Sequence, residues 1–253
     1  MKKLLLLVLL GSQWLASAQK SSIPVGEQFT YTASYNMAGL MTQLAQVTLS
    51  TEMVSTSTKN LLHLSCEAAT YSKWDSFFKI RDSYESYVDP VSLKPSLYKR
   101  DIFEGGYTKK EKYLFQKDGK SIASTVLKKK KPETKATFAI KLGTQDIVSL
   151  IYKLRTIDFA HQTKQQITRF TAVFDEKELG VSVKYLGTER INAGVLGEKL
   201  CYKISIGAQT SALRGTDKNL IWLTADSQKV PGLIRFSIPV GTGQLLLTKM
   251  TKN

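Results

Sequence analysis

Apolar and polar residues alternate with a period of two along most of this 253-residue chain. Successive side chains of a β-strand point to opposite faces of its sheet, so the alternation predicts strands with one buried and one exposed face. In the first such segment Phe29, Tyr31, Ala33 and Tyr35 share a face. Turn-forming dipeptides separate the segments, and Asp118-Gly119 is typical of a tight hairpin. The alternation therefore favours an antiparallel sheet whose strands follow one another along the chain.

The predicted strands cover residues 29–35, 45–53, 62–68, 78–88, 97–104, 107–116, 121–127, 137–142, 167–174, 181–191, 200–206, 220–224, 233–239 and 244–250. One segment has helical spacing instead, since apolar residues recur on one stripe from Ile147 to Leu154. We expect Thr144 to cap this helix and Asp146 to favour its first turn. With one short helix and no linker, residues 19–253 are predicted to form a single all-β domain. Its large antiparallel meander is expected to curve into a half-open or closed barrel.

Residues Met1–Ala18 have the pattern of a secretory signal peptide. Lys2 and Lys3 precede an unbroken apolar run, Leu4–Leu10, and Ala16-Ser17-Ala18 supplies small residues for cleavage. The run is too short to span a bilayer, so the chain is not expected to cross a membrane after cleavage. No cysteine follows the cleavage site, so we expect no lipid anchor. The predicted location is the periplasm, with the extracellular space as the alternative.

The formal charge of +15 favours anionic partners, which for an exported protein are lipid headgroups and acidic glycans. The most concentrated charge is the run Lys128, Lys129, Lys130 and Lys131. Adjacent lysines repel one another, so this run is predicted to be an exposed loop or hairpin tip. It is either a contact for an anionic surface or a solvated tip without a partner. Aromatic residues do not interleave with it, so we expect no nucleic-acid partner.

Sequence patterns for catalysis are missing. The two histidines, His63 and His161, lie far apart in the sequence, and no nucleophile elbow, phosphate loop or dinucleotide fingerprint occurs. We therefore expect no enzyme activity, no metal site and no cofactor. The two cysteines, Cys66 and Cys201, are predicted to point to opposite faces of their strands, which argues against a disulfide between them.

Asp82 is the most unusual polar residue of the predicted strands. It shares a face with Ile80 and Tyr84, and an inward carboxylate must find hydrogen-bond partners because an unpaired buried charge is costly. Arg100 and Arg155 are the expected partners. The residues around Asp82 are then either a polar pocket or a satisfied network that sets strand register, and the sequence leaves both open.

Five blocks occur in a consistent order: Arg81-Asp82-x-Tyr84-Glu85-x-x-Val88-Asp89, Leu93-x-Pro95-x-x-Tyr98, Glu104-Gly105-Gly106-Tyr107, Asp146-Ile147-Val148-Ser149-Leu150-x-Tyr152-x-Leu154-Arg155, and Ile221-Trp222-Leu223-Thr224-x-Asp226. In these blocks the chain resembles an exported bacterial family known as "domain of unknown function 3108". The resemblance implies a signal peptide, an antiparallel β architecture similar to the half-barrels of periplasmic lipoprotein carriers, and no established activity. The candidate polar-network or ligand residues within the blocks are Arg81, Asp82, Glu85, Glu104, Asp146, Arg155, Trp222 and Asp226.

Together these features predict an exported, non-enzymatic envelope protein of a Gram-negative bacterium. Its curved sheet is expected to bind a lipid, a lipoprotein acyl chain or another amphiphilic ligand. The alternative is a structural or assembly module that binds an envelope protein or an acidic glycan. A hydrolase is a third hypothesis, and it requires a histidine or a carboxylate pair in a cleft.

Overall fold

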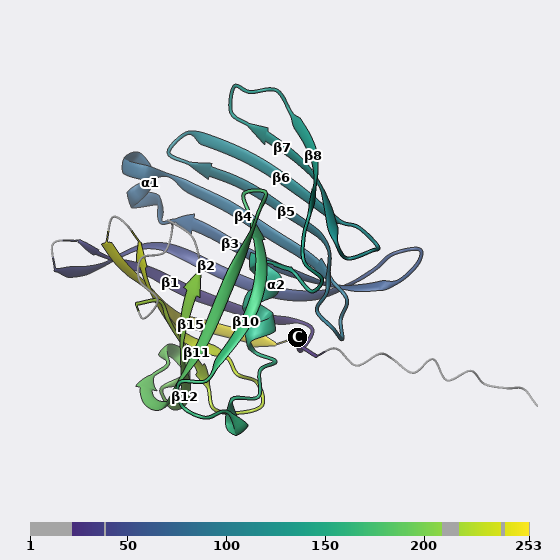
Figure 1. The fold of residues 1–253 in the computed structure, drawn as a ribbon. Helices are drawn as coiled ribbons and strands as arrows, with labels where there is room; N and C mark the ends of the chain where they lie inside the picture. The colour runs from purple at the N-terminus through teal and green to yellow at the C-terminus, as the bar shows by residue number, and fades with distance from the viewer. Residues whose placement is uncertain (1–21, 38, 209–217, 239–240, 253) are drawn as a thin grey trace, which may run out of the picture.

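The strands of the protein form one continuous curved sheet (Figure 1). The computed structural model describes residues 22–37, 39–208, 218–238 and 241–252, with the side chains of Met37 and Ile238 left out. Within this part of the chain the sheet has 15 strands, so the predicted all-β architecture is confirmed. The predicted signal peptide, residues 1–18, lies outside the described residues.

The strands are β1 (Glu27–Met37), β2 (Leu40–Ser55), β3 (Asn60–Thr70), β4 (Ile80–Val88), β5 (Pro95–Glu104), β6 (Tyr107–Phe115), β7 (Ser121–Lys128), β8 (Thr134–Ala139), β9 (Gln145–Asp146), β10 (Ile167–Phe174), β11 (Lys177–Asn192), β12 (Glu198–Ala208), β13 (Leu220–Thr224), β14 (Pro231–Ile238) and β15 (Gly241–Lys252). The helices are α1 (Ser72–Phe78), α2 (Ile147–Leu154) and the 3-10 turns η1 (Phe159–His161) and η2 (Gly194–Leu196).

Strand β1 lies in the middle of the sheet. Strands β2 to β8 follow it on one side, and β15 back to β9 follow on the other. Neighbouring strands are antiparallel except for the short parallel pair β9–β10. The outermost strands, β8 and β9, do not pair, so the structure has the open form of the predicted barrel. Such an order results when consecutive strands pair with one another and the first strand, β1, pairs with the last, β15.

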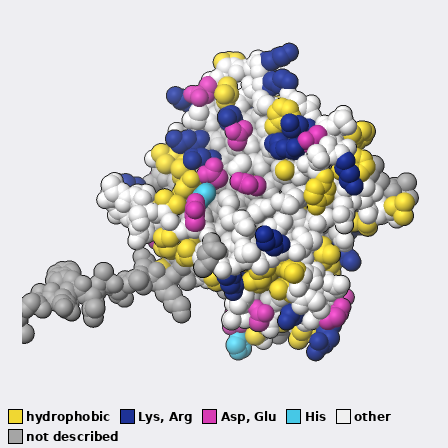
Figure 2. All heavy atoms as spheres, turned by 180° about the vertical axis from the view of Figure 1, so that it is seen from behind, with side chains coloured by type: hydrophobic (Ala, Val, Ile, Leu, Met, Phe, Trp, Pro, Cys, Tyr) yellow, Lys and Arg dark blue, Asp and Glu magenta, His cyan; other side chains and the backbone are white. Residues whose placement is uncertain are grey.

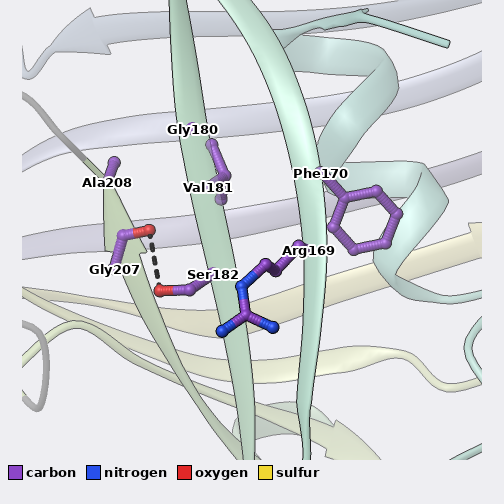
Figure 3. Close-up of a pocket in the computed structure, with 7 residues that line it drawn as sticks. All are labelled: Arg169, Phe170, Gly180, Val181, Ser182, Gly207 and Ala208. Atoms are coloured by element: carbon purple, nitrogen blue, oxygen red, sulfur yellow. Dashed lines mark hydrogen bonds between the residues drawn. The ribbon is translucent and has the colours of Figure 1, made fainter.

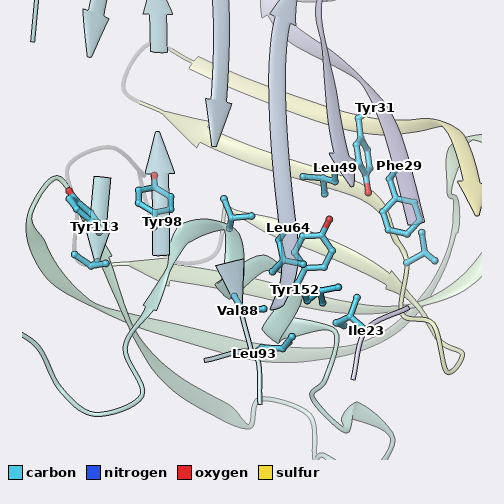
Figure 4. Close-up of a cluster of buried hydrophobic side chains, with 14 of the residues drawn as sticks. Ile23, Phe29, Tyr31, Leu49, Leu64, Val88, Leu93, Tyr98, Tyr113 and Tyr152 are labelled. Atoms are coloured by element: carbon cyan, nitrogen blue, oxygen red, sulfur yellow. The ribbon is translucent and has the colours of Figure 1, made fainter. Parts of the chain in front are cut away.

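Helix α2 packs on the face of the sheet that the alternation marks as buried. Its Tyr152 is fully buried with Leu64 and Val88, and the Tyr152 hydroxyl donates to the Ser50 carbonyl at 3.1 Å (Figure 4). Phe29 belongs to the same cluster. The helix therefore fills part of the concavity with aromatic and aliphatic side chains, as its apolar stripe predicts.

The prediction that Thr144 caps helix α2 is wrong. Asp146 is the N-cap, and its Oδ1 accepts hydrogen bonds from the backbone N–H groups of Val148 and Ser149 at 2.9 and 2.8 Å. Ser149 Oγ accepts from the Asp146 N–H in return, which completes a capping box. Thr144 instead bonds to Glu178 at 2.5 Å. The reason is position, because a cap must directly precede the first helical residue.

Helix α1 is not anticipated by the sequence pattern. The alternation predicts a strand from residue 78, but Phe78 ends helix α1 and the strand starts at Ile80. Seven residues are too few to establish a helical period, and no residue of α1 is buried. The helix thus crosses one end of the sheet with its aromatic side chains only partly covered.

The β10–β11 hairpin links the two arms of the open sheet. Its turn residues Asp175 and Glu176 both have positive φ, and they contact the β5–β7 arm (Figure 1). Glu176 accepts from Ser124 Oγ at 2.6 Å, and its N–H donates to the Tyr113 hydroxyl at 2.8 Å. Side-chain contacts therefore bring the arms together without strand pairing.

Candidate functional site

The predicted site residues do not converge on one place. Arg155 ends helix α2, and its guanidinium binds the carboxylate of Glu27 at 2.7 and 3.1 Å and the Gln228 carbonyl at 3.0 Å. Both charged side chains are buried. The expected pair of Arg155 with Asp82 is therefore wrong, because the guanidinium of Arg155 pairs with Glu27 on β1, whereas Asp82 lies on β4 beside Ala68 of β3. Arg155 ties α2 to β1 rather than forming a pocket.

Asp82 is buried, as expected, and among the described residues it makes no ion pair with an arginine, although the positive charge of Arg100 acts on it at longer range. Its Oδ1 accepts from the Phe103 N–H at 3.1 Å, and the Tyr84 hydroxyl lies 3.4 Å from Oδ2. Burial and the neighbouring carboxyl of Glu104 raise the pKa of Asp82 to about 6. Arg100, the other expected partner, binds Glu111 at 3.0 Å instead. Asp82 and Glu104 thus form a local carboxyl pair between β4 and β5.

The remaining candidates have local partners. Glu85 accepts from the Tyr87 hydroxyl at 2.7 Å. Trp222 lies buried on the sheet face opposite the α2 core, where its Nε1 donates to Glu189 at 2.9 Å. Asp226 accepts from the Thr224 hydroxyl at 2.9 Å in the turn before β14. These contacts set the geometry of strands and turns.

Both cysteines are free. Cys66 packs against the core that contains α2, whereas Cys201 is buried on the other face. Burial raises the pKa of Cys201 to about 11 and that of Cys66 to about 12, so both thiols stay protonated at neutral pH.

The lysine run lies at the tip of the β7–β8 hairpin. Lys129, Lys130 and Lys131 are exposed, and Lys128 ends β7. Lys129 Nζ donates to the carbonyl of Gly106 in the neighbouring β5–β6 turn. The run therefore lies at the same end of the sheet as helix α1, because the Gly105 N–H in that turn donates to the carbonyl of Lys79.

The main apolar hollow of this end lies between α1 and the sheet. It has a volume of about 710 Å³, within the range of about 300–1,000 Å³ that is usual for small-molecule sites. Its lining residues come from β1, β2, β3, α1, β4 and β14: Ala33, Ser34, Tyr35, Leu44, Ala45, Thr70, Trp74, Phe77, Phe78, Ile80 and Phe236. Because alternate residues share a face, Ala45 lies on the same face of β2 as Leu49 of the α2 core. We call this hollow the α1 cavity.

Polar contacts hold α1 over the cavity. Asp75 binds the guanidinium of Arg81 at 2.6 Å and accepts from the Thr70 hydroxyl at 2.6 Å. These two hydrogen bonds lower the pKa of Asp75 below its usual value. Trp74 Nε1 donates to the Gln43 carbonyl at 2.8 Å. Among the candidate residues named from the sequence, Arg81 is therefore the one that holds a wall of the cavity in place.

The glycine block between β5 and β6 also serves this wall. Gly105 has a φ of +55°, and a Cβ atom there would lie 2.4 Å from the ring of Phe78. A larger residue would displace Phe78 from the cavity. The sequence signal for the cavity was thus the aromatic run of α1 together with Gly105, whereas Ala33, Ala45 and Phe236 carry no signal of their own.

A second hollow lies on β10, β11 and β12 and is smaller, about 350 Å³. Figure 3 shows Arg169 beside Ser182, whose hydroxyl donates to the Gly207 carbonyl at 3.3 Å. Phe170 is the one large apolar side chain of its lining. This hollow therefore lacks the apolar enclosure of the α1 cavity.

Two further properties bear on the kind of site. In the part of the chain that the structure describes, no cluster of three or more His, Cys, Asp or Glu side chains is placed to hold a metal ion. No helix among the described residues combines the length and apolar character needed to cross a membrane.

The fold and the cavity define a β-barrel-like protein with an open sheet and an apolar hollow at one end. The chain belongs to the family described as "Protein of unknown function (DUF3108)", whose model matches residues 30–248. The family expected from the sequence blocks is thereby confirmed. No curated protein sequence matches the chain.

Two solved structures are similar to it. One is a β-barrel-like protein of domain of unknown function DUF1849 from Brucella abortus, with a TM-score of 0.58, 11% identity and coverage of 91% of this chain and 99% of that one. The other is described as a "putative exported protein with YmcC-like fold" and is from Bacteroides fragilis NCTC 9343. Its TM-score is 0.30 at 8% identity, with coverage of 92% and 100%. The first similarity supports the fold and no particular activity.

Proposed function

We propose that this protein is an exported, non-enzymatic binding protein that holds the apolar chain of an amphiphile in the α1 cavity. The single observation that supports this is the lining, in which Ser34, Thr70 and the Tyr35 hydroxyl are the polar groups among aliphatic and aromatic side chains. An apolar chain that enters such a hollow leaves water and meets mainly apolar side chains.

The arrangement of α1 also favours a ligand. Phe77 is 80% exposed and Phe78 is 46% exposed, although both line the cavity. Large aromatic side chains at the rim of a hollow become buried when an apolar ligand fills it, which strengthens binding. Export to the periplasm is part of the proposal and is supported by the signal pattern of residues 1–18.

The direct test is to purify residues 19–253 from bacteria, extract the protein with organic solvent and identify bound lipid by mass spectrometry. Affinity is then measured with a dansyl-labelled fatty acid. The Trp222→Phe background makes Trp74, at the cavity, the energy-transfer donor. The expected result is saturable transfer that unlabelled fatty acid reverses.

The variant Ala45→Leu places extra carbon atoms in the cavity and should weaken probe binding by about fivefold or more, since overfilling a site costs about 1–3 kcal/mol. Ala123→Leu on β7, outside the cavity, is the matched control and should bind as the parent does. Absence of co-purified lipid together with equal probe affinity for both variants would refute the proposal.

A further inference from the structure

Several connections gather at one end of the sheet, which we call the rim. Because neighbouring strands run antiparallel, the β1–β2, β5–β6 and β7–β8 connections and helix α1 all lie at this end (Figure 1). Hydrogen bonds join the β7–β8 tip to the β5–β6 turn, from Lys129 to Gly106, and that turn to the end of α1, from Gly105 to Lys79. The α1 cavity lies at this same end.

The rim exposes large apolar side chains. Leu40, which begins β2, is 75% exposed, and Phe77 of α1 is 80% exposed. Three more apolar side chains are exposed here: Met41 next to Leu40 in β2, Phe78 next to Phe77 in α1, and Tyr107 at the start of β6. Phe236 lines both the α1 cavity and a neighbouring groove that includes Met41, Lys218 and Arg235, so the two hollows share a wall at Phe236.

Lysines surround this apolar surface. Lys73 and Lys79 flank the aromatic residues of α1, and the run Lys128–Lys131 follows on the β7–β8 tip. In Figure 2 yellow apolar side chains lie among dark-blue basic ones along the right-hand side of the molecule. The nearby carboxylate of Asp75 is neutralised by Arg81. The rim thus combines protruding apolar groups with excess positive charge.

We propose that the rim docks on the surface of an anionic phospholipid bilayer. Aromatic and leucine side chains insert at the level of the headgroups, and lysines attract the negative surface, which is the combination found in interfacial membrane anchors. The occupant is assigned by charge complementarity, because lipid phosphates match the lysines while the acyl region accepts Phe77 and Leu40. The role of this docking surface rests on the proposed function, in which the bilayer supplies or receives the ligand at the mouth of the α1 cavity.

The test is co-sedimentation of residues 19–253 with vesicles of phosphatidylglycerol and phosphatidylcholine in equal parts, and with vesicles of phosphatidylcholine alone. Binding is expected to the anionic vesicles and to fall with added salt. Replacing all four residues of the run Lys128–Lys131 by Gln should weaken binding by about tenfold or more. The pair Leu40→Ser and Phe77→Ser should weaken it to a similar extent.

The opposite end of the sheet offers matched controls. Leu142 is 70% exposed there, and Lys94, Lys117 and Lys120 lie in loops of that end. Leu142→Ser and the triple change of these lysines to Gln should leave vesicle binding unchanged. Equal losses from both ends, or no loss from the rim variants, would overturn the docking surface.

Two outcomes separate this inference from the proposed function. If vesicle binding fails while the dansyl fatty acid still binds, the docking surface is refuted and the cavity function stands. If soluble dextran sulfate displaces the protein completely and Leu40→Ser with Phe77→Ser has no effect, the rim binds an acidic polymer rather than a bilayer, which also refutes the docking surface.

Discussion

At the scale of single residues, the carboxyl groups of Asp82 and Glu104 share a site between β4 and β5. Burial and the Glu104 carboxyl raise the pKa of Asp82 to about 6, whereas an aspartate in an unfolded chain titrates near 3.9. The native state therefore holds the Asp82 proton more tightly. The free energy of unfolding should fall as pH rises from about 4 to about 6, because the unfolded state binds fewer protons over that range.

Asp82→Asn removes this titration and keeps an oxygen that accepts from the Phe103 N–H. We expect the variant to exceed the parent in free energy of unfolding by about 1–2 kcal/mol near pH 7.5, and the difference to vanish near pH 4. Urea unfolding at several pH values measures this. Asp101→Asn, on the exposed side of β5, is the control and should show no such trend. Parallel pH profiles of parent and Asp82→Asn would contradict the shared carboxyl site.

At the scale of elements, the β10–β11 hairpin is held by its turn rather than by its strands alone. Asp175 binds Arg100 at 2.8 Å and Lys109 at 2.7 Å, and Glu111 is the other carboxylate between these two cations. Local unfolding of a folded protein occurs most readily in the elements that have the fewest tertiary contacts. The turn contacts therefore determine how firmly the two arms of the sheet are joined.

Asp175→Ala should release the hairpin from the β5–β7 arm. We expect amide hydrogen exchange in residues 167–180 to quicken by about tenfold, because an ion-pair contact of about 1–2 kcal/mol is lost, while β1–β3 keep their protection. Lys177→Ala, at the next exposed position, is the control. An equal loss of protection throughout the sheet would show instead that the hairpin opens only with the whole protein.

The elements differ in how well the sequence predicted them, and the reason is the range of the interactions that form them. The bounds of β10 and β13 agree with their alternation, because that pattern lies within each strand. Helix α1 was missed since its stability comes from Arg81, Thr70 and Gln43 rather than from an apolar stripe. The α1 cavity could not be predicted, because Ala45 and Phe236 meet only after β1 pairs with β15. Of the residues that hold α1, only Arg81 lies in one of the family blocks, whereas Thr70, Asp75 and Gln43 lie outside them.

At the scale of the whole molecule, an open sheet has two edges that a closed barrel lacks. In the described chain β8 is one of them, and it pairs with β7 alone. Its residues are exposed almost throughout, and unpaired edge strands can add strands from another molecule. Lys135, 75% exposed in β8, is placed where a charge opposes such pairing.

Lys135→Val should therefore promote association through β8. We expect the variant to form concentration-dependent dimers or larger species while its circular dichroism stays that of the parent, since β-branched apolar residues favour strand pairing and the opposing charge is gone. Size-exclusion chromatography with light scattering measures the change. Lys112→Val on β6, an interior strand with both neighbours present, adds the same exposed valine without a free edge. If only Lys135→Val associates, the open edge of the sheet is the cause of association. If both variants associate equally, the added apolar surface is the cause and the prediction is wrong.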